Sequence, residues 1–89
     1  MNKQIVEFKD FNRTRKIRQG GFCLTHKNRL EWQIKVFAGE TFTGCKFFTV
    51  AIIERREILE TFRLDGNAKF STFAEYAKDS LKRLQWHLM

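Results

Sequence analysis

The sequence predicts an α+β fold, a single small domain in which an antiparallel sheet of three to five strands carries one C-terminal α-helix packed on one face. The chain has 89 residues, which is enough for one core and too few for two. Apolar and polar residues alternate from 30 to 36, as in a half-buried strand, and apolar residues recur at helical spacing from 73 to 88. One helix covers only one face of a sheet, so the other face is solvated or used for binding.

Residues 1–19 are expected to form a basic N-terminal arm or a short element. Ile5, Phe8 and Phe11 could line one side of a helix, whereas Val6 and Phe8 also suit a short strand. Gly20–Gly21 is the first clear break in the chain.

The sheet is expected to occupy residues 20–65 and to begin with a β-hairpin. Apolar side chains of its second strand alternate with charged or polar ones and lie at Leu30, Trp32, Ile34 and Val36. Phe22 and Leu24 alternate in the same way upstream, and the Lys27–Asn28 step can form a tight turn because Asn tolerates positive φ.

The second half of the sheet is less regular. Residues 38–44 are expected to form a loop with Phe42 as its apolar anchor, and residues 46–53, rich in β-branched and aromatic types, a central strand covered on both faces. Residues 52–62 fit either a strand that follows a turn at 54–57 or an apolar helical face that Arg55 interrupts. Both interpretations stay open.

A helix is predicted over residues 72–88, after the stop signal Asp65–Gly66–Asn67. Thr72 and Glu75 have the spacing of a capping box, and Asp79 and Arg83 that of a favourable (i, i+4) ion pair. The apolar face of this helix comprises Phe73, Ala77, Leu81, Leu84 and Leu88.

The charge is unevenly distributed along the chain. The formal net charge is +7, and residues 1–36 hold nine basic and three acidic side chains. Clustered cations suit the phosphates of nucleic acid, an acidic protein surface, or simple solvation. The candidate nucleic-acid contacts are Arg13, Arg15, Lys16, Arg18, Lys27, Arg29, Gln33 and Lys35. If the first hairpin enters a major groove, Gln33 and Lys35 on its polar face could meet base edges.

The chain is rich in aromatic residues, with ten Phe, two Trp and one Tyr. Most of these rings are expected to fill the core, but exposed rings on a sheet can also stack on unpaired bases or form a dimer or partner interface. The candidates for uncovered interface rings are Phe37, Phe42 and Phe47.

Catalysis, metal binding and cofactor binding are not expected. Cys23, His26, Cys45 and His87 offer ligand types for zinc without its local spacing, and both cysteines are expected to be buried free thiols. Glu54, Glu57 and Glu60 lie beside arginines and indicate a surface charge cluster, and no glycine-rich phosphate loop occurs. We also expect no small-molecule substrate, no membrane partner and a cytoplasmic location, because no signal-like or membrane-spanning apolar run is present.

These observations predict a small, non-enzymatic, basic domain that contacts DNA or RNA through the phosphate backbone. The alternative is a small protein-binding regulator or inhibitor that docks on an acidic surface of a larger complex, or forms a homodimer.

Overall fold

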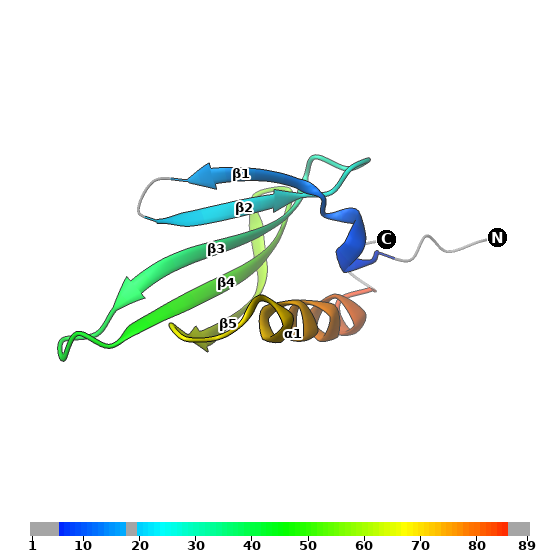
Figure 1. Ribbon diagram of the computed structural model, residues 1–89. Helices are drawn as coiled ribbons and strands as arrows, with labels where there is room; N and C mark the ends of the chain where they lie inside the picture. Colours follow the sequence, from blue (N-terminus) through cyan, green and yellow to red (C-terminus); the bar gives the residue numbers. More distant parts are fainter. Residues whose placement is uncertain (1–5, 18–19, 86–89) are drawn as a thin grey trace.

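Five antiparallel strands follow one another across a single sheet in chain order, and a helix follows the last of them (Figure 1). The computed structural model describes residues 6–17 and 20–85. Both the α+β class and the position of the helix on one face confirm the fold predicted from the sequence. The elements are η1 (Phe8–Asp10), β1 (Arg13–Ile17), β2 (Gly21–Thr25), β3 (Trp32–Glu40), β4 (Lys46–Glu54), β5 (Glu57–Asp65) and α1 (Phe70–Arg83).

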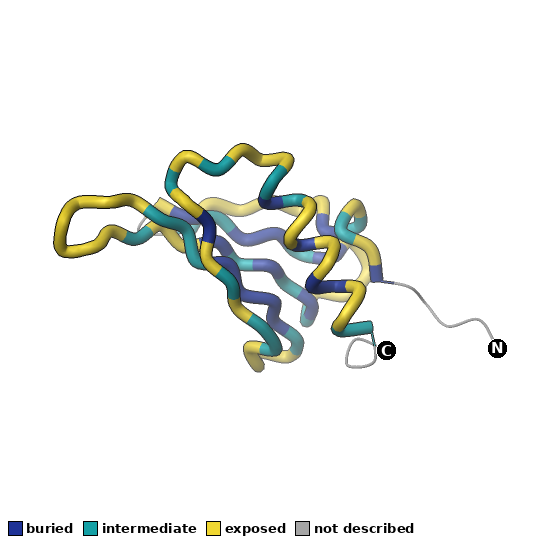
Figure 2. Tube along the Cα trace, turned by 90° about the horizontal axis from the view of Figure 1, so that it is seen from below, coloured by how far each residue is buried: buried dark blue, intermediate teal, exposed yellow. Residues whose placement is uncertain are grey.

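The core lies between α1 and one face of the sheet. In the strand register, Leu24 of β2 lies opposite Ile34 of β3, which lies opposite Ile52 of β4, so all three side chains point to the same face. They belong to one buried cluster with Phe73, Ala77 and Leu81, which recur at helical spacing on α1. Figure 2 shows the buried residues in the strands behind the helix.

The central strand is β4, as its apolar composition predicts. It pairs with β3 on one side and β5 on the other, and its residues 50–53 are buried whichever face they point to. The strand interpretation of 52–62 is confirmed and the helical alternative is wrong. Arg55 and Arg56 form the two-residue turn with φ of 50° and 69°, the positive values of a hairpin turn whose twist matches the strands.

Residues 13–17 do not belong to a free arm, because they form strand β1 at the edge of the sheet. They pair along their full length with β2, from Arg13 opposite Thr25 to Ile17 opposite Gly21. Gly21 is buried, and a Cβ there would come within 2.0 Å of the Val36 carbonyl oxygen, so β2 approaches β3 closely at this glycine.

Two predicted loops differ from the structure. Residues 26–31 form a longer connection than a tight Lys27–Asn28 turn, and Leu30 in it is 63% exposed rather than buried in a strand. β3 continues to Glu40, so the β3–β4 connection spans only residues 41–45. Phe42 does not anchor it, since its side chain is fully exposed at the turn. Backbone bonds close this turn instead, among them one from the Thr41 N–H to the Cys45 carbonyl at 2.9 Å.

The helix begins and ends earlier than the sequence predicts. It starts at Phe70 with Lys69 as an N-cap that makes no side-chain bond, so Thr72 and Glu75 lie inside the first turns and form no capping box. Helical structure ends at Arg83, and Leu88 lies outside the described residues.

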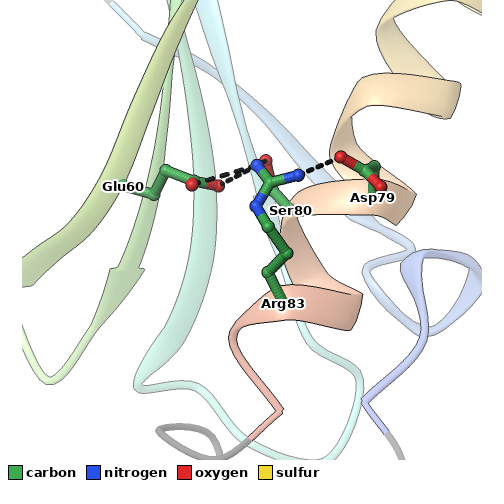
Figure 3. A network of polar contacts seen from close by, with 4 residues as sticks. All are labelled: Glu60, Asp79, Ser80 and Arg83. Carbon is green, nitrogen blue, oxygen red and sulfur yellow. Dashed lines mark hydrogen bonds and ion pairs between the residues drawn. The ribbon is translucent and has the colours of Figure 1, made fainter.

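The predicted pair of Arg83 with Asp79 is present, and Arg83 also donates to Glu60 of β5 at 2.9 Å (Figure 3). This link joins the last turn of α1 to the edge strand. Within the described part of the chain, no helix is both long and apolar enough to cross a membrane.

Candidate nucleic-acid interface

The sheet has a second face, opposite α1, which we call the open face. Residues directly opposite each other in antiparallel strands share a face, so the register defines it. One row of partners crosses all five strands and consists of Arg15, Cys23, Lys35, Ala51 and Thr61. The row on one side of it contains Arg13, Thr25, Gln33 and Ile53. The row on the other side contains Phe37, Thr49 and Arg63.

The open face is positively charged. Its cations are Arg13 and Arg15 on β1, Lys35 on β3 and Arg63 on β5, and none of them forms an ion pair with a described carboxylate. A carboxylate does share the face, Asp65, at the end of β5 opposite Phe47. Neighbouring strands lie about 4.8 Å apart, so the strands of Arg15 and Lys35 are separated by about one Debye length at ordinary ionic strength, and the fields of the two cations overlap.

The middle of the open face is formed by short side chains between long ones. Cys23 and Ala51 are almost completely buried although α1 covers the opposite face. They lie in the same row as Arg15 and Lys35, whose side chains are longer. Short side chains therefore alternate with cationic ones along this row.

Aromatic rings gather at the end of the open face nearest the β3–β4 turn. The ring of Phe47 lies over Gly39 of the paired strand, where an added Cβ would come within 2.6 Å of it. The guanidinium carbon of Arg63 lies 4.5 Å from the centroid of that ring. Phe37, two residues from Gly39 along β3, is 38% exposed on the same face. The fully exposed Phe42 shares a shallow hollow with Phe47 and Arg63, which Glu40 and Thr41 also line.

The structure brings together only part of the predicted site. Arg13, Arg15, Gln33 and Lys35 share the open face with Phe37 and Phe47, as the alternation of the strands requires. Lys16 points to the opposite face, because its partner is Phe22 of the core side. Arg18 lies outside the described residues.

The loop cations Lys27 and Arg29 are not part of the open face. Lys27 pairs with Asp10 at 3.3 Å, and Arg29 pairs with Glu31 at 3.6 Å and lies over the Trp32 ring. These partners partly neutralise the two cations, and the Lys27–Asp10 pair links the 26–31 connection to η1.

The sequence analysis missed Arg63, which lies far along the chain from the basic N-terminal third. The signal was available in the alternation of β5, where Arg63 stands between Phe62 and Leu64 and must therefore point away from the core. Its cation–π contact with Phe47 could not be foreseen without the register.

The cysteines and His26 do not assemble into a metal site. Among the described residues, no three His, Cys, Asp or Glu side chains gather closely enough to hold an ion. Cys23 is buried as expected, but Cys45 is exposed in the β3–β4 turn, so that expectation was wrong. His26 is buried edge-to-face between Phe11 and Trp32, and burial lowers its pKa.

Comparison of the chain with protein-family models, with curated proteins and with solved structures finds no match.

Proposed function

We propose that this protein is a non-enzymatic nucleic-acid-binding domain that contacts the phosphate backbone through the open face of its sheet. The observation that carries the proposal is the set of four cations, Arg13, Arg15, Lys35 and Arg63, on one face of the sheet without ion-pair partners among the described carboxylates. A cytoplasmic location forms part of the same proposal.

The physical basis is the release of counterions from a polyanion. Each phosphate that a Lys or Arg neutralises releases condensed cations, and this favours binding at low salt whatever the base sequence. Uncharged donors lie between the cations, at Thr25, Gln33, Thr49 and Thr61. Hydroxyl and amide groups of this kind commonly bond to phosphate and sugar oxygens, which fixes the position of the strand on the protein.

Binding is favoured over catalysis because the open face offers donors rather than a reacting pair. The thiol of Cys23 is buried, and Asp65 on the same face accepts a hydrogen bond from the backbone N–H of Asn67 at 2.9 Å. General acid–base or nucleophilic chemistry needs two such groups in reach of each other.

The second candidate is docking on an acidic protein surface, which the exposed Phe42 beside the cations favours. Interfaces between proteins combine an apolar centre with a charged rim. Such a protein would leave free DNA and RNA unbound at about 150 mM salt, where exposed charge pairs are strongly screened.

The test compares two triple variants that change the net charge equally. Arg13→Gln/Arg15→Gln/Lys35→Gln removes three open-face cations, whereas Lys69→Gln/Lys78→Gln/Lys82→Gln removes three exposed cations on or next to α1. Binding to a fluorescein-labelled oligonucleotide is measured by anisotropy at about 50 mM salt. We expect the first variant to bind roughly a hundredfold more weakly or worse and the second to bind nearly as wild type, because only the first loses phosphate contacts. Equal losses in both variants would contradict the proposal.

A further inference from the structure

The open face is too broad for the major groove of a duplex. Four gaps of about 4.8 Å make it about 19 Å wide, compared with a groove of about 12 Å that admits a helix or a two-stranded ribbon. Gln33 and Lys35 lie on β3, which is flanked by β2 and β4, so they cannot enter a groove on a free hairpin. The ligand must instead lie flat across the sheet.

The aromatic end of the face offers ring surfaces that the fold leaves uncovered. The side chain of Phe42 is fully exposed, and the β3–β4 turn that carries it projects beyond the other strands (Figure 1). Phe37 exposes 38% of its surface on the same face. The rings of unpaired bases stack on exposed aromatic side chains, whereas the bases of a duplex are already stacked on each other.

Arg63 connects the charged and aromatic parts of the face. Its guanidinium lies over the Phe47 ring, and the same side chain lines the hollow that contains Phe42. A planar guanidinium held on a ring still has N–H groups at its edge for a phosphate oxygen. Phosphate contacts and ring contacts therefore adjoin at this end of the sheet.

We infer that the open face takes single-stranded nucleic acid in preference to a duplex, with unpaired bases stacked on Phe42 and Phe37 and the backbone contacting Arg13, Arg15, Lys35 and Arg63. This inference rests on the proposed nucleic-acid binding and specifies its ligand. The strand runs across the sheet from the β1 cations to the rings near the β3–β4 turn. Stacking of this kind tolerates any base, so no sequence preference is required.

The experiment measures anisotropy of three labelled probes, a 15-nucleotide poly(dT), a 15-nucleotide poly(U) and a 20-base-pair duplex, with unlabelled poly-L-glutamate as a competitor. The variants are Phe42→Leu, which keeps an apolar side chain without a ring, and Phe42→Tyr, which restores a ring. Phe70→Leu is the matched control, because it makes the same substitution at a Phe that is also largely exposed but lies at the start of α1. Circular dichroism verifies that each variant is folded.

We expect both single strands to bind at least roughly tenfold more tightly than the duplex, and Phe42→Leu to weaken them about 5- to 150-fold, the range for loss of one stacked base. Phe42→Tyr should restore binding and Phe70→Leu should leave it unchanged. The ratio of poly(U) to poly(dT) affinity then assigns RNA or DNA as the better single strand.

The experiment distinguishes a failure of nucleic-acid binding from a failure of the preference for single strands. If none of the three probes binds at about 50 mM salt, nucleic-acid binding itself is refuted. If the duplex binds as tightly as the single strands, or if Phe42→Leu has no effect, only the single-strand inference falls. If poly-L-glutamate displaces the single strands as well as unlabelled poly(dT) does, the face recognises charge alone and the stacking inference is overturned.

Discussion

The salt dependence of binding is a quantitative test of the open face. Each phosphate contact contributes about 0.7 to the slope of log K against log salt for a single strand. Four contacts, from Arg13, Arg15, Lys35 and Arg63, predict a slope of about −2.8, so the affinity falls about 50-fold between 50 and 200 mM salt. The triple variant that retains only Arg63 should have a slope of about −0.7 and lose only about threefold over the same range.

The assay is an anisotropy titration at five salt concentrations for the wild type and both triple variants. The variant lacking Lys69, Lys78 and Lys82 carries the same net charge as the open-face variant but should keep a slope of about −2.8, because its phosphate contacts are intact. A slope reduced equally in both variants would mean that net charge alone drives binding and would refute the assignment to the open face. Size-exclusion chromatography accompanies each titration to detect self-association. The charged side chains on edge strand β1 also oppose pairing between the sheets of two copies, and the open-face variant removes two of them.

Two further predictions concern the core beneath the site. Leu81→Ala, at a position that is almost completely buried, should lower the free energy of unfolding by about 2–5 kcal/mol. Leu30→Ala, in the exposed 26–31 connection, should change it by less than about 0.5 kcal/mol. Equal effects of the two substitutions in urea unfolding would contradict the placement of α1. Burial lowers the pKa of His26, and its Nδ1 accepts a bond from the Asn28 backbone N–H at 3.1 Å, so the folded protein takes up this proton less readily than the unfolded chain. The contribution of neutral His26 to the free energy of unfolding should therefore be fully present above about pH 6.5 and be lost as the pH falls from there through the lower pKa of the folded state. His26→Asn keeps an acceptor but does not titrate, so it should flatten this part of the plot of unfolding free energy in urea against pH. An unaltered plot would show that another group is responsible.

Periodicity predicted the elements whose side chains segregate clearly by burial. Trp32, Ile34 and Val36 are buried in β3, and Phe73, Ala77 and Leu81 face the sheet from α1. In both cases the hydrophobic effect acts on every second residue or every third to fourth residue, and that pattern is visible in the sequence. The same reasoning left β5 open between a strand and a helical face, because its residues segregate less clearly by burial.

The ends of the elements could not be predicted in the same way. The helix starts at Phe70 without a side-chain cap, although Thr72 and Glu75 have the spacing of a capping box. The Phe8, Phe70 and Phe73 rings lie 5.5 to 6.3 Å apart, and this packing lies at the start of the helix. Tertiary contacts of this kind can outweigh a cap worth about 1 kcal/mol.

The candidate site was predictable in composition but not in arrangement. Alternation alone separates Arg13 and Arg15 from Lys16 once residues 13–17 are known to be a strand, yet the sequence left that segment between an arm and a short element. Which strands adjoin, and hence that Arg63 joins Phe47 and lies on the same face as Lys35, follows only from the register. The register of a hairpin depends on the length and type of its turn, and the sequence did not settle the turn between β4 and β5.

The same charge pattern bears on self-association. In a two-fold symmetric dimer through the open face, each copy presents the same patch to its partner, so Arg13, Arg15, Lys35 and Arg63 would meet a second set of the same cations. Like charges brought together in a partly desolvated interface cost several kcal/mol, and the two carboxylates near the face, Asp65 and Glu40, are too few to compensate four cations in each copy. A homodimer would therefore have to use a different surface, and its formation would leave the open face available for a polyanion.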